Sequence, residues 1–253
     1  FSIEEYEKSV FCPDCGMHLW PKFVKDKTGT QRPPKGKKAT VIEPIDPSTE
    51  VNLATIFAEF NRLTDFDCGE GEIIENVPLW ITDRRRAYDD FRGRLSRNKL
   101  VSLEKLSEDF RQFLYFENNH SWTKLHRTGL AALSNPERLW KLLVHIQDES
   151  VPIQRRIENA LEGQYHVYGI GKNIITGLLH MFNPDVYGVW NSRTDDTLNL
   201  IRRKPSQTVG VGNKYLAINR ELKKLATELE TDLTTIDGLM WYVSKRLKSQ
   251  LLC

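Results

Sequence analysis

The sequence after Leu79 consists almost entirely of segments with helical periodicity, joined by short polar stretches. Apolar side chains recur in these segments three and four positions apart, which places them on one face of an α-helix. Helices with a single apolar face bury it by packing against one another. The sequence therefore predicts a mainly α fold, with helices over 51–63, 84–97, 138–146, 152–161, 174–182, 192–201, 213–230 and 235–248 and another that starts at 102.

Helix-start signals support these boundaries. Ser102 precedes one helix, and Asn135 with Pro136 precedes another, in the order expected of an N-cap residue and an N1 proline. Ser192 is predicted to cap the helix over 192–201. The motif Thr-Thr-Ile-Asp at 234–237 is typical of a capping box at the start of the last helix, with Asp237 in the cap.

Residues 1–78 differ in composition and predict a separate small module. The stretch 26–38 combines Pro, Gly and Lys as in a loop that is not buried, and 40–45 has the pattern of an edge strand. We place the domain boundary after residue 78, with an N-terminal α+β or zinc-knuckle-like module over 1–78 and a helical domain over 79–253. The chain does not begin with Met, so we also expect residues upstream, with room for an effector domain.

Cysteine spacing suggests a metal site in the N-terminal module. Cys12 and Cys15 form a C-x2-C pair, which brings two thiolates onto one ion, and His18 and Cys68 are the candidates for the remaining ligands. These residues predict a structural zinc site. The alternative is a set of reduced structural thiols, because a second C-x2-C or an H-x3-H is missing.

Basic residues gather in three parts of the chain. The net charge of +2 is too small to indicate a nucleic acid by itself. However, Lys and Arg cluster within 22–38, 84–99 and 202–204. Each cluster alone is compatible with a solvated surface, whereas the three together favour a polyanionic partner, DNA or RNA.

Several functional classes lack their sequence signals. The chain has no run of about 18 apolar residues and no secretory leader, so we expect an intracellular protein with no membrane partner. Walker, H-E-x-x-H and G-x-S-x-G patterns are also absent, which argues against the commonest ATPases and hydrolases. His145, His166 and His180 stand singly on helices, as core or surface residues do, and Trp241 and Tyr242 belong to an apolar stripe.

A two-glycine turn at 167–171, Val-Tyr-Gly-Ile-Gly, is the strongest local motif. Gly169 and Gly171 can take positive φ and leave room for an anion to approach the backbone amides around Ile170. A helix that begins near Lys172 adds unpaired N–H groups and the positive end of its dipole. The turn therefore predicts a phosphate-binding site, with a simple helix stop as the alternative.

Residues 165–201 as a block resemble the helix-hairpin-helix DNA glycosylase superfamily, of which endonuclease III is a member. In that family the hairpin turn holds a DNA phosphate, and a following segment places a catalytic aspartate at a helix start. The matching stretch here is Val-Trp-Asn-Ser-Arg-Thr at 189–194. The resemblance implies double-stranded DNA with a flipped base as the partner. The nucleic-acid contacts that follow are Gly169, Ile170, Gly171, Lys172 and Arg193.

Two positions depart from the family pattern. Asn173 stands where lyase-type members have a nucleophilic lysine, and Lys172 lies one position early, on a different helix face. Asn191 replaces the catalytic aspartate, and a neutral amide stabilises a positively charged sugar less than a carboxylate does. Asp195 lies four positions later on the same face and is the candidate substitute.

Residues 115–128 form a second island of polar and aromatic side chains. A pocket for an extruded base needs hydrogen-bonding groups and a stacking surface, and Trp122 is a candidate for the stacking surface. The predicted pocket comprises Asn118, Asn119, His120, Trp122, His126 and Arg127, together with Trp190. The alternative is a polar helix cap around a core tryptophan.

The sequence as a whole favours a DNA-binding protein that recognises a flipped, damaged or modified base. A restriction or phage-defence system is the setting suggested by analogy. One alternative is an active monofunctional DNA glycosylase that uses Asn191 or Asp195. Another is a protein-interaction module in which the hairpin only ends a helix.

Overall fold

The computed structural model describes residues 10–11, 18–19, 52–68, 73–99, 102–206 and 209–249, with the backbone alone at 10–11, 18–19 and 247–249. The chain divides into two units, Phe1–Lys37 and Lys38–Cys253. In the first unit, β1 (Val10–Phe11) pairs antiparallel with β2 (His18–Leu19). The strand predicted over 40–45 lies outside the described residues.

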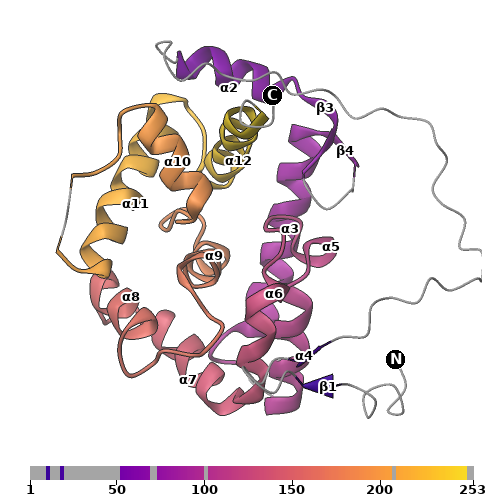
Figure 1. Cartoon of the computed structure of the whole chain (residues 1–253), viewed down its shortest axis with the longest axis vertical. Helices are drawn as coiled ribbons and strands as arrows, with labels where there is room; N and C mark the ends of the chain where they lie inside the picture. The colour runs from indigo at the N-terminus through magenta and orange to yellow at the C-terminus, as the bar shows by residue number, and fades with distance from the viewer. Residues whose placement is uncertain are drawn as a thin grey trace, which may run out of the picture. The chain divides into compact units, whose positions relative to one another are not determined.

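The second unit is mainly helical, as the periodicity predicts (Figure 1). Its elements are α2 (Leu53–Asn61), β3 (Thr64–Asp67), β4 (Ile73–Asn76), α3 (Val77–Leu95), α4 (Leu103–Phe113), α5 (Phe116–Asn119), α6 (His126–Gly129), the 3-10 helix η1 (Leu130–Ser134), α7 (Pro136–Ile146), α8 (Ile153–Leu161), α9 (Lys172–Phe182), α10 (Ser192–Leu200), α11 (Val211–Glu228) and α12 (Leu233–Ser249). Among the described residues, no helix is both long and apolar enough to cross a bilayer.

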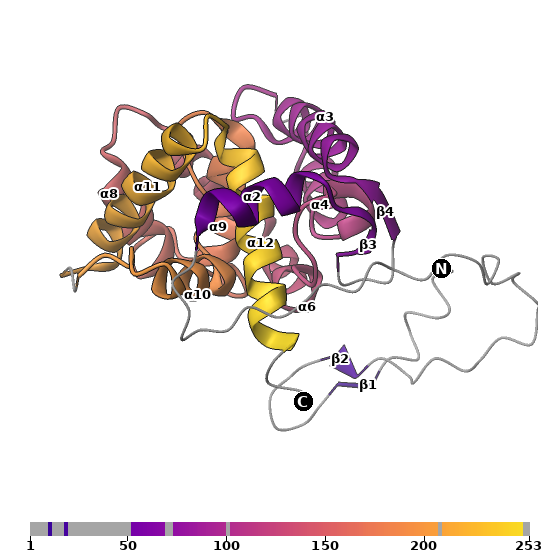
Figure 2. The ribbon, with the colours of Figure 1, turned by 90° about the horizontal axis from the view of Figure 1, so that it is seen from above.

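Helix α9 is the central element of this unit. It packs against both α3 and α8. Figures 1 and 2 show it with α3 and α4 on one side and with α8 and α11 on the other. Ile175 and Leu178 of α9 are completely buried, because apolar side chains occupy nearly every face of this helix. The two ends of α9 are therefore its accessible parts.

The capping residues only partly match the sequence prediction. Ser102 accepts a hydrogen bond from the Lys105 amide at 3.1 Å, and Asn135 accepts one from the Arg138 amide at 3.0 Å, as predicted. The caps predicted for the last helix and for α10 are wrong. The Asp232 side chain caps α12, whereas Ser192 lies inside α10, one residue after its actual cap.

A short hairpin, β3 with β4, was not predicted. In the antiparallel register Phe66 is opposite Ile74. The Phe66 ring is fully buried, and its centroid lies 5.5 Å from that of Trp80 and 5.4 Å from that of Trp241. These aromatic contacts tie residues 52–76 to α3 and α12 within the second unit, so this unit's boundary does not coincide with the predicted boundary after residue 78.

A buried polar network joins α3 to α12. Arg84 is fully buried, and its Nε donates to the Ser121 Oγ at 3.0 Å, while another nitrogen pairs with Asp237. The Asp237 Oδ2 also accepts from the Trp122 Nε1 at 3.1 Å. Burial raises the pKa of Tyr88, a further partner of Arg84, to about 12. Asp237 is thus a buried counter-ion, and its predicted place in a helix cap is wrong.

His180 of α9 lies next to this network and is completely buried. Its Nδ1 is 2.7 Å from the Tyr187 carbonyl oxygen, which only accepts, so Nδ1 carries the proton. The Nε2 atom then accepts from the Thr234 hydroxyl at 3.2 Å. Burial lowers the pKa of His180 to about 4, although Asp237 opposes that shift. The predicted core role of this histidine is confirmed, and the ring is neutral at pH 7.

This burial predicts an acid-sensitive fold. An unfolded chain protonates His180 below its ordinary pKa of 6.5, whereas the folded chain does so only below about 4. The free energy of unfolding should therefore fall as the pH drops from 6.5 to 4, by roughly 3 kcal/mol from this group, with no effect above pH 7. Urea unfolding at several pH values measures the slope.

The variant His180→Gln should flatten this slope, because glutamine does not titrate. The matched control is His166→Gln, which changes an exposed histidine. Identical slopes for wild type and His180→Gln between pH 6.5 and 4 would contradict the assignment.

Candidate functional site

The turn between α8 and α9 is held by an internal hydrogen bond and by a close contact with α6. The Ile170 amide donates to the Val167 carbonyl oxygen at 3.0 Å, which closes the turn. Gly169 has a φ of +86°, and a Cβ added there would lie 2.3 Å from the Thr128 carbonyl oxygen. Only glycine satisfies both the conformation and the close approach. The turn is therefore fixed in one shape against α6.

Helix α9 begins without a side-chain cap. Gly171 occupies the N-cap position in extended conformation, with a φ of −102°, and is exposed to solvent. Within the described part of the chain, the amides of Gly171, Lys172 and Asn173 donate to no other group. The Ile170 amide, predicted to contact phosphate, is instead used inside the turn. The next three amides take over that candidate role.

A cation, a carboxylate and an indole meet beside this helix start. The Lys172 Nζ lies 2.6 Å from one carboxylate oxygen of Asp195, and the Trp190 Nε1 donates to the other at 3.1 Å. The same Nζ is 4.4 Å from the centroid of the Trp190 ring, a cation–π contact. The structure thus brings together a predicted nucleic-acid contact (Lys172), a candidate catalytic residue (Asp195) and a predicted member of the base pocket (Trp190).

The charged side chains of this cluster are partly buried. The side chains of Lys172 and Asp195 are 34% and 21% exposed. Burial raises the pKa of Asp195, but the hydrogen bonds from Lys172 and Trp190 outweigh it, so the pKa stays below its ordinary value. Asp195 is therefore an ionised carboxylate near neutral pH. Lys214 of α11 adds a second cation, 5.4 Å from the centroid of the Trp190 ring.

Local hydrogen bonds place Asp195 next to Lys172. The Trp190 amide donates to the Thr176 Oγ1 at 2.9 Å, which fastens the extended segment before α10 onto α9. Asn191 then caps α10, because its Oδ1 accepts from the Thr194 amide at 3.0 Å within a capping box. Asp195 follows in the first turn of α10, where the helix dipole favours a negative charge.

Asn191 has a structural role in this arrangement. Its side-chain oxygen accepts from the Thr194 backbone amide, so a catalytic role for that oxygen requires breaking the cap of α10. Arg193, one of the predicted nucleic-acid contacts, donates to the Thr123 Oγ1 at 3.3 Å. The half-exposed Arg193 connects the start of α10 to the 115–128 island.

Within that island, Trp122 and Asn119 belong to the core. Trp122 is buried, and its ring stacks on Tyr88 with centroids 5.5 Å apart. Asn119 is buried as well, and its Oδ1 accepts from the Ser121 and Trp122 amides, each at 2.7 Å. The predicted base-stacking role of Trp122 is therefore wrong, because Tyr88 and the protein core cover the ring. Asn119 organises the loop instead of reading a base.

The other residues of the predicted pocket are placed separately. Asn118 and Arg127 are exposed. His120 ends α5 in a left-handed conformation, and its carbonyl oxygen accepts from the Trp80 Nε1 at 2.7 Å. His126 stacks on Tyr115 with centroids 5.0 Å apart.

Trp190 was also predicted to line this pocket. It is buried beneath the Lys172–Asp195 pair, where it supports that pair. These positions do not form the predicted pocket.

The metal prediction stays a prediction. Cys12 and Cys15 lie outside the described residues, and His18 is described only as backbone in β2. Cys68 is buried in the second unit, where its carbonyl oxygen accepts from the Trp241 Nε1 at 3.2 Å. Among the residues with described side chains, no cluster of three or more His, Cys, Asp or Glu suits a metal ion.

The basic cluster at 84–99 is largely neutralised by acids. Arg84 is buried against Asp237, and Arg94 bridges Asp90 at 2.9 Å and Asp109 at 2.5 Å. The remaining acidic partners pair with Arg85, Arg86, Arg92 and Arg97. This corrects the expectation that all the arginines of the cluster are unpaired and form a surface that binds a polyanion. The lysines within 22–38 lie outside the described residues.

Sequence reasoning missed Lys214 and Thr123, which complete the surroundings of the site. Lys214 lies on α11, outside every motif, and Thr123 lies in the island but was not among its predicted pocket residues. Their proximity depends on tertiary packing alone. In comparisons with known proteins, no family model, no curated protein and no solved structure matches this chain.

Proposed function

We propose that this chain binds double-stranded DNA through the turn between α8 and α9, in the manner of a helix-hairpin-helix glycosylase-like domain, and recognises a flipped, damaged or modified base. The observation that carries the proposal is the uncapped start of α9, whose unpaired amides adjoin the Lys172–Asp195 pair. A backbone phosphate supplies the acceptors that these amides lack, and the helix dipole favours its charge.

The shape of the turn supports a close approach of a DNA strand. Gly171 is exposed and has no side chain, and nothing lies within 4 Å of the position of its missing Cβ. Tyr168, at the tip of the turn, is 76% exposed, which is unusual for so large a side chain. An exposed aromatic ring beside a phosphate site can stack on a sugar or a base.

The same geometry supports a position for the proposed flipped nucleotide. Because Trp122 and Asn119 are buried, the polar side chains next to the hairpin are those of Arg193 and of the Lys172–Asp195 pair. Lys172 and Arg193 donate hydrogen bonds and Asp195 accepts them. These three side chains replace the 115–128 island as the proposed contacts to the base.

The Lys172–Asp195 pair also favours a second candidate, an active DNA glycosylase. Asp195 is an ionised carboxylate beside the proposed strand, and such a group stabilises the positive charge that develops on the sugar during base excision. We rank recognition above excision because Lys172 and Trp190 already occupy both oxygens of Asp195. A reaction through Asp195 requires the substrate to displace the lysine.

The proposed test is the substitution Gly171→Val. The backbone at Gly171 accepts any residue and the site is open, so the variant should fold, with a melting temperature within about 4 °C of the wild type. Its branched side chain stands where the phosphate would approach the helix start. Affinity for all duplexes should fall by at least about tenfold, the loss of a charge-assisted contact of roughly 1.4 kcal/mol. Fluorescence anisotropy at low salt measures the affinity.

The matched control is Gly93→Val, because nothing lies within 4 Å of a Cβ at Gly93 in α3. It should bind duplexes as the wild type does. Equal affinities of Gly171→Val and wild type would refute the hairpin contact. No binding to any duplex at low salt would favour the protein-interaction alternative.

Duplexes with a panel of damaged or modified bases, treated with alkali after incubation, separate recognition from excision. Recognition predicts a preference for one modified base without strand breaks. Strand breaks that disappear in Asp195→Asn would establish the glycosylase candidate instead.

A further inference from the structure

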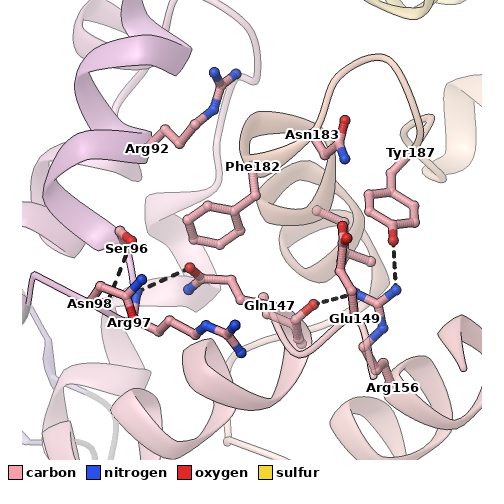
Figure 3. Close-up of a pocket in the computed structure, with 12 residues that line it drawn as sticks. Arg92, Ser96, Arg97, Asn98, Gln147, Glu149, Arg156, Phe182, Asn183 and Tyr187 are labelled. Atoms are coloured by element: carbon pink, nitrogen blue, oxygen red, sulfur yellow. Dashed lines mark hydrogen bonds between the residues drawn. The ribbon is translucent and has the colours of Figure 1, made fainter. Parts of the chain in front are cut away.

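A pocket of about 240 Å³ lies between the end of α3, helix α8 and the end of α9 (Figure 3). Its lining includes three arginines, Arg92, Arg97 and Arg156, and one carboxylate, that of Glu149. The cationic groups thus outnumber the anionic groups in its wall. Phe182 ends α9 here, roughly 15 Å along the helix from the glycine turn at its other end.

Arg156 is the most unusual member of this lining. It is only 4% exposed, and no carboxylate among the described residues lies within ion-pair distance of it. Its Nη1 donates to the Ile146 carbonyl oxygen at 2.8 Å, and its Nη2 donates to the Tyr187 hydroxyl at 2.6 Å. Its Nε is buried and has no hydrogen-bond partner. A buried guanidinium normally has an anionic partner, so this one lacks a counter-ion.

The other two arginines are paired with acids, but these contacts do not use all of their N–H groups. The Arg97 Nη1 is 3.9 Å from Asp148, a long and exposed contact. Arg92 pairs with Asp89 at 3.1 Å through Nη1 and donates from Nε to the Met181 carbonyl oxygen, while its Nη2 has no hydrogen bond within the described residues. Glu149 is exposed and makes no ion pair among the described side chains.

Hydrogen bonds of Gln147 hold the wall between these arginines together. The Gln147 side chain donates to the carbonyl oxygens of Leu95 and Leu143, at 3.2 and 2.9 Å. Its oxygen accepts from the Arg97 amide at 3.1 Å, which holds the start of the Arg97 side chain in place (Figure 3). Asn98 and Asn183 add amide groups to the lining. The lining therefore presents several hydrogen-bond donors, and Gln147 ties the end of α3 to the end of α7 beside them.

We propose that this pocket binds a phosphate group. Guanidinium groups match the oxygens of phosphate in geometry and charge, and a phosphate anion would supply the partner that Arg156 lacks. The volume lies below the roughly 300 Å³ of a small drug-sized site, so it suits one phosphate with little else enclosed. The phosphate comes from a free mononucleotide or from a DNA backbone. The inference does not depend on the hairpin, which is at the other end of α9.

The test follows the Nε–H signals of the arginines by ¹H–¹⁵N NMR while inorganic phosphate is added, with chloride at equal ionic strength as the reference. The Arg156 signal is identified by its loss in Arg156→Lys. Phosphate should shift this signal in a saturable way, because the Nε–H gains an acceptor or the guanidinium gains a counter-ion. Chloride should leave it unchanged.

Two further titrations, with deoxyadenosine monophosphate and with a short duplex, identify the source. A tighter response to the mononucleotide indicates a free ligand, and a response to the duplex indicates a backbone phosphate. Either supports the proposal.

Arg97→Ala, a change of a half-exposed side chain that leaves the backbone contacts in place, should weaken phosphate binding by about tenfold. The control Arg155→Ala removes an arginine that is adjacent in sequence, exposed and paired with Glu158, and should leave the affinity within about twofold.

An Arg156 signal that does not respond to any of the three phosphates would overturn the proposal. So would a Glu149→Gln variant whose Arg156 signal has moved before any phosphate is added and then no longer responds, because Glu149 would then be the missing counter-ion.

Discussion

Replacing Asp237 with alanine should lower the free energy of unfolding by about 3–5 kcal/mol, the usual cost of breaking one side of a buried ion pair. The variant leaves the Arg84 guanidinium buried with its charge unpaired. It also removes the acceptor of the Trp122 Nε1. Urea unfolding followed by circular dichroism measures the loss.

The control for this prediction is Arg85→Ala, one position along α3. Arg85 pairs with Asp232 at the surface, where both side chains are well exposed. Water screens such a pair, so its loss should cost less than about 1 kcal/mol. Similar losses for Asp237→Ala and Arg85→Ala would mean that burial of the Arg84 network is not what stabilises the contact of α3 with α12.

Gly169→Ala should destabilise the protein by at least about 2 kcal/mol. An alanine at a φ of +86° is strained, and its Cβ would lie 2.3 Å from the Thr128 carbonyl oxygen, so the backbone of one segment has to move. The hairpin and α6 would then separate. Thermal unfolding of the variant measures the effect, and amide exchange should report the opening at residues 167–171.

Gly171→Ala is the matched control in the same turn. Its φ of −102° suits any residue, and the Cβ meets no atom within 4 Å. The change should cost less than about 1 kcal/mol, the difference between Gly and Ala as an N-cap residue. If both alanine variants lost the same stability, strain at Gly169 would not explain the effect.

The helical parts of the fold could be predicted because their signals are local. Periodicity and a cap within four residues place the starts of α4 and α7 at Ser102 and Asn135, and the structure agrees. The β3–β4 hairpin was missed because each strand has only four residues and its main contacts, from Phe66 to Trp80 and Trp241, are distant in sequence. Periodicity cannot detect a short strand that is held by tertiary packing.

The candidate site was predictable only in part, for the same reason. The glycine turn and Lys172 belong to one contiguous motif, so the sequence indicates them directly. The pairing of Lys172 with Asp195 depends on how Thr176 fastens the segment before α10, which no local pattern encodes. Asn191 occupies the position that matches the catalytic aspartate of the resembled family. Asparagine is also a common N-cap residue, so the residue type alone does not distinguish a catalytic role from a capping role.

The 115–128 island shows that a polar residue type does not determine exposure. Asn119 looks like a recognition residue in the sequence, yet its amide satisfies the backbone of a buried loop. Trp122 donates to a buried carboxylate, a partner that lies 115 positions away in the chain. Because their polar groups find hydrogen-bond partners inside the protein, Asn119 and Trp122 lie in the core and do not line a pocket.

The indole of Trp190 gives the site an internal optical reporter. Its N–H donates to the carboxylate that holds the Lys172 ammonium, and the same ammonium lies over its ring. Any event that draws the lysine away alters the charge on both the edge and the face of this fluorophore at once. The part of the emission that is lost in Trp190→Phe, and so does not come from the five other tryptophans, therefore monitors the state of the ion pair without an added label.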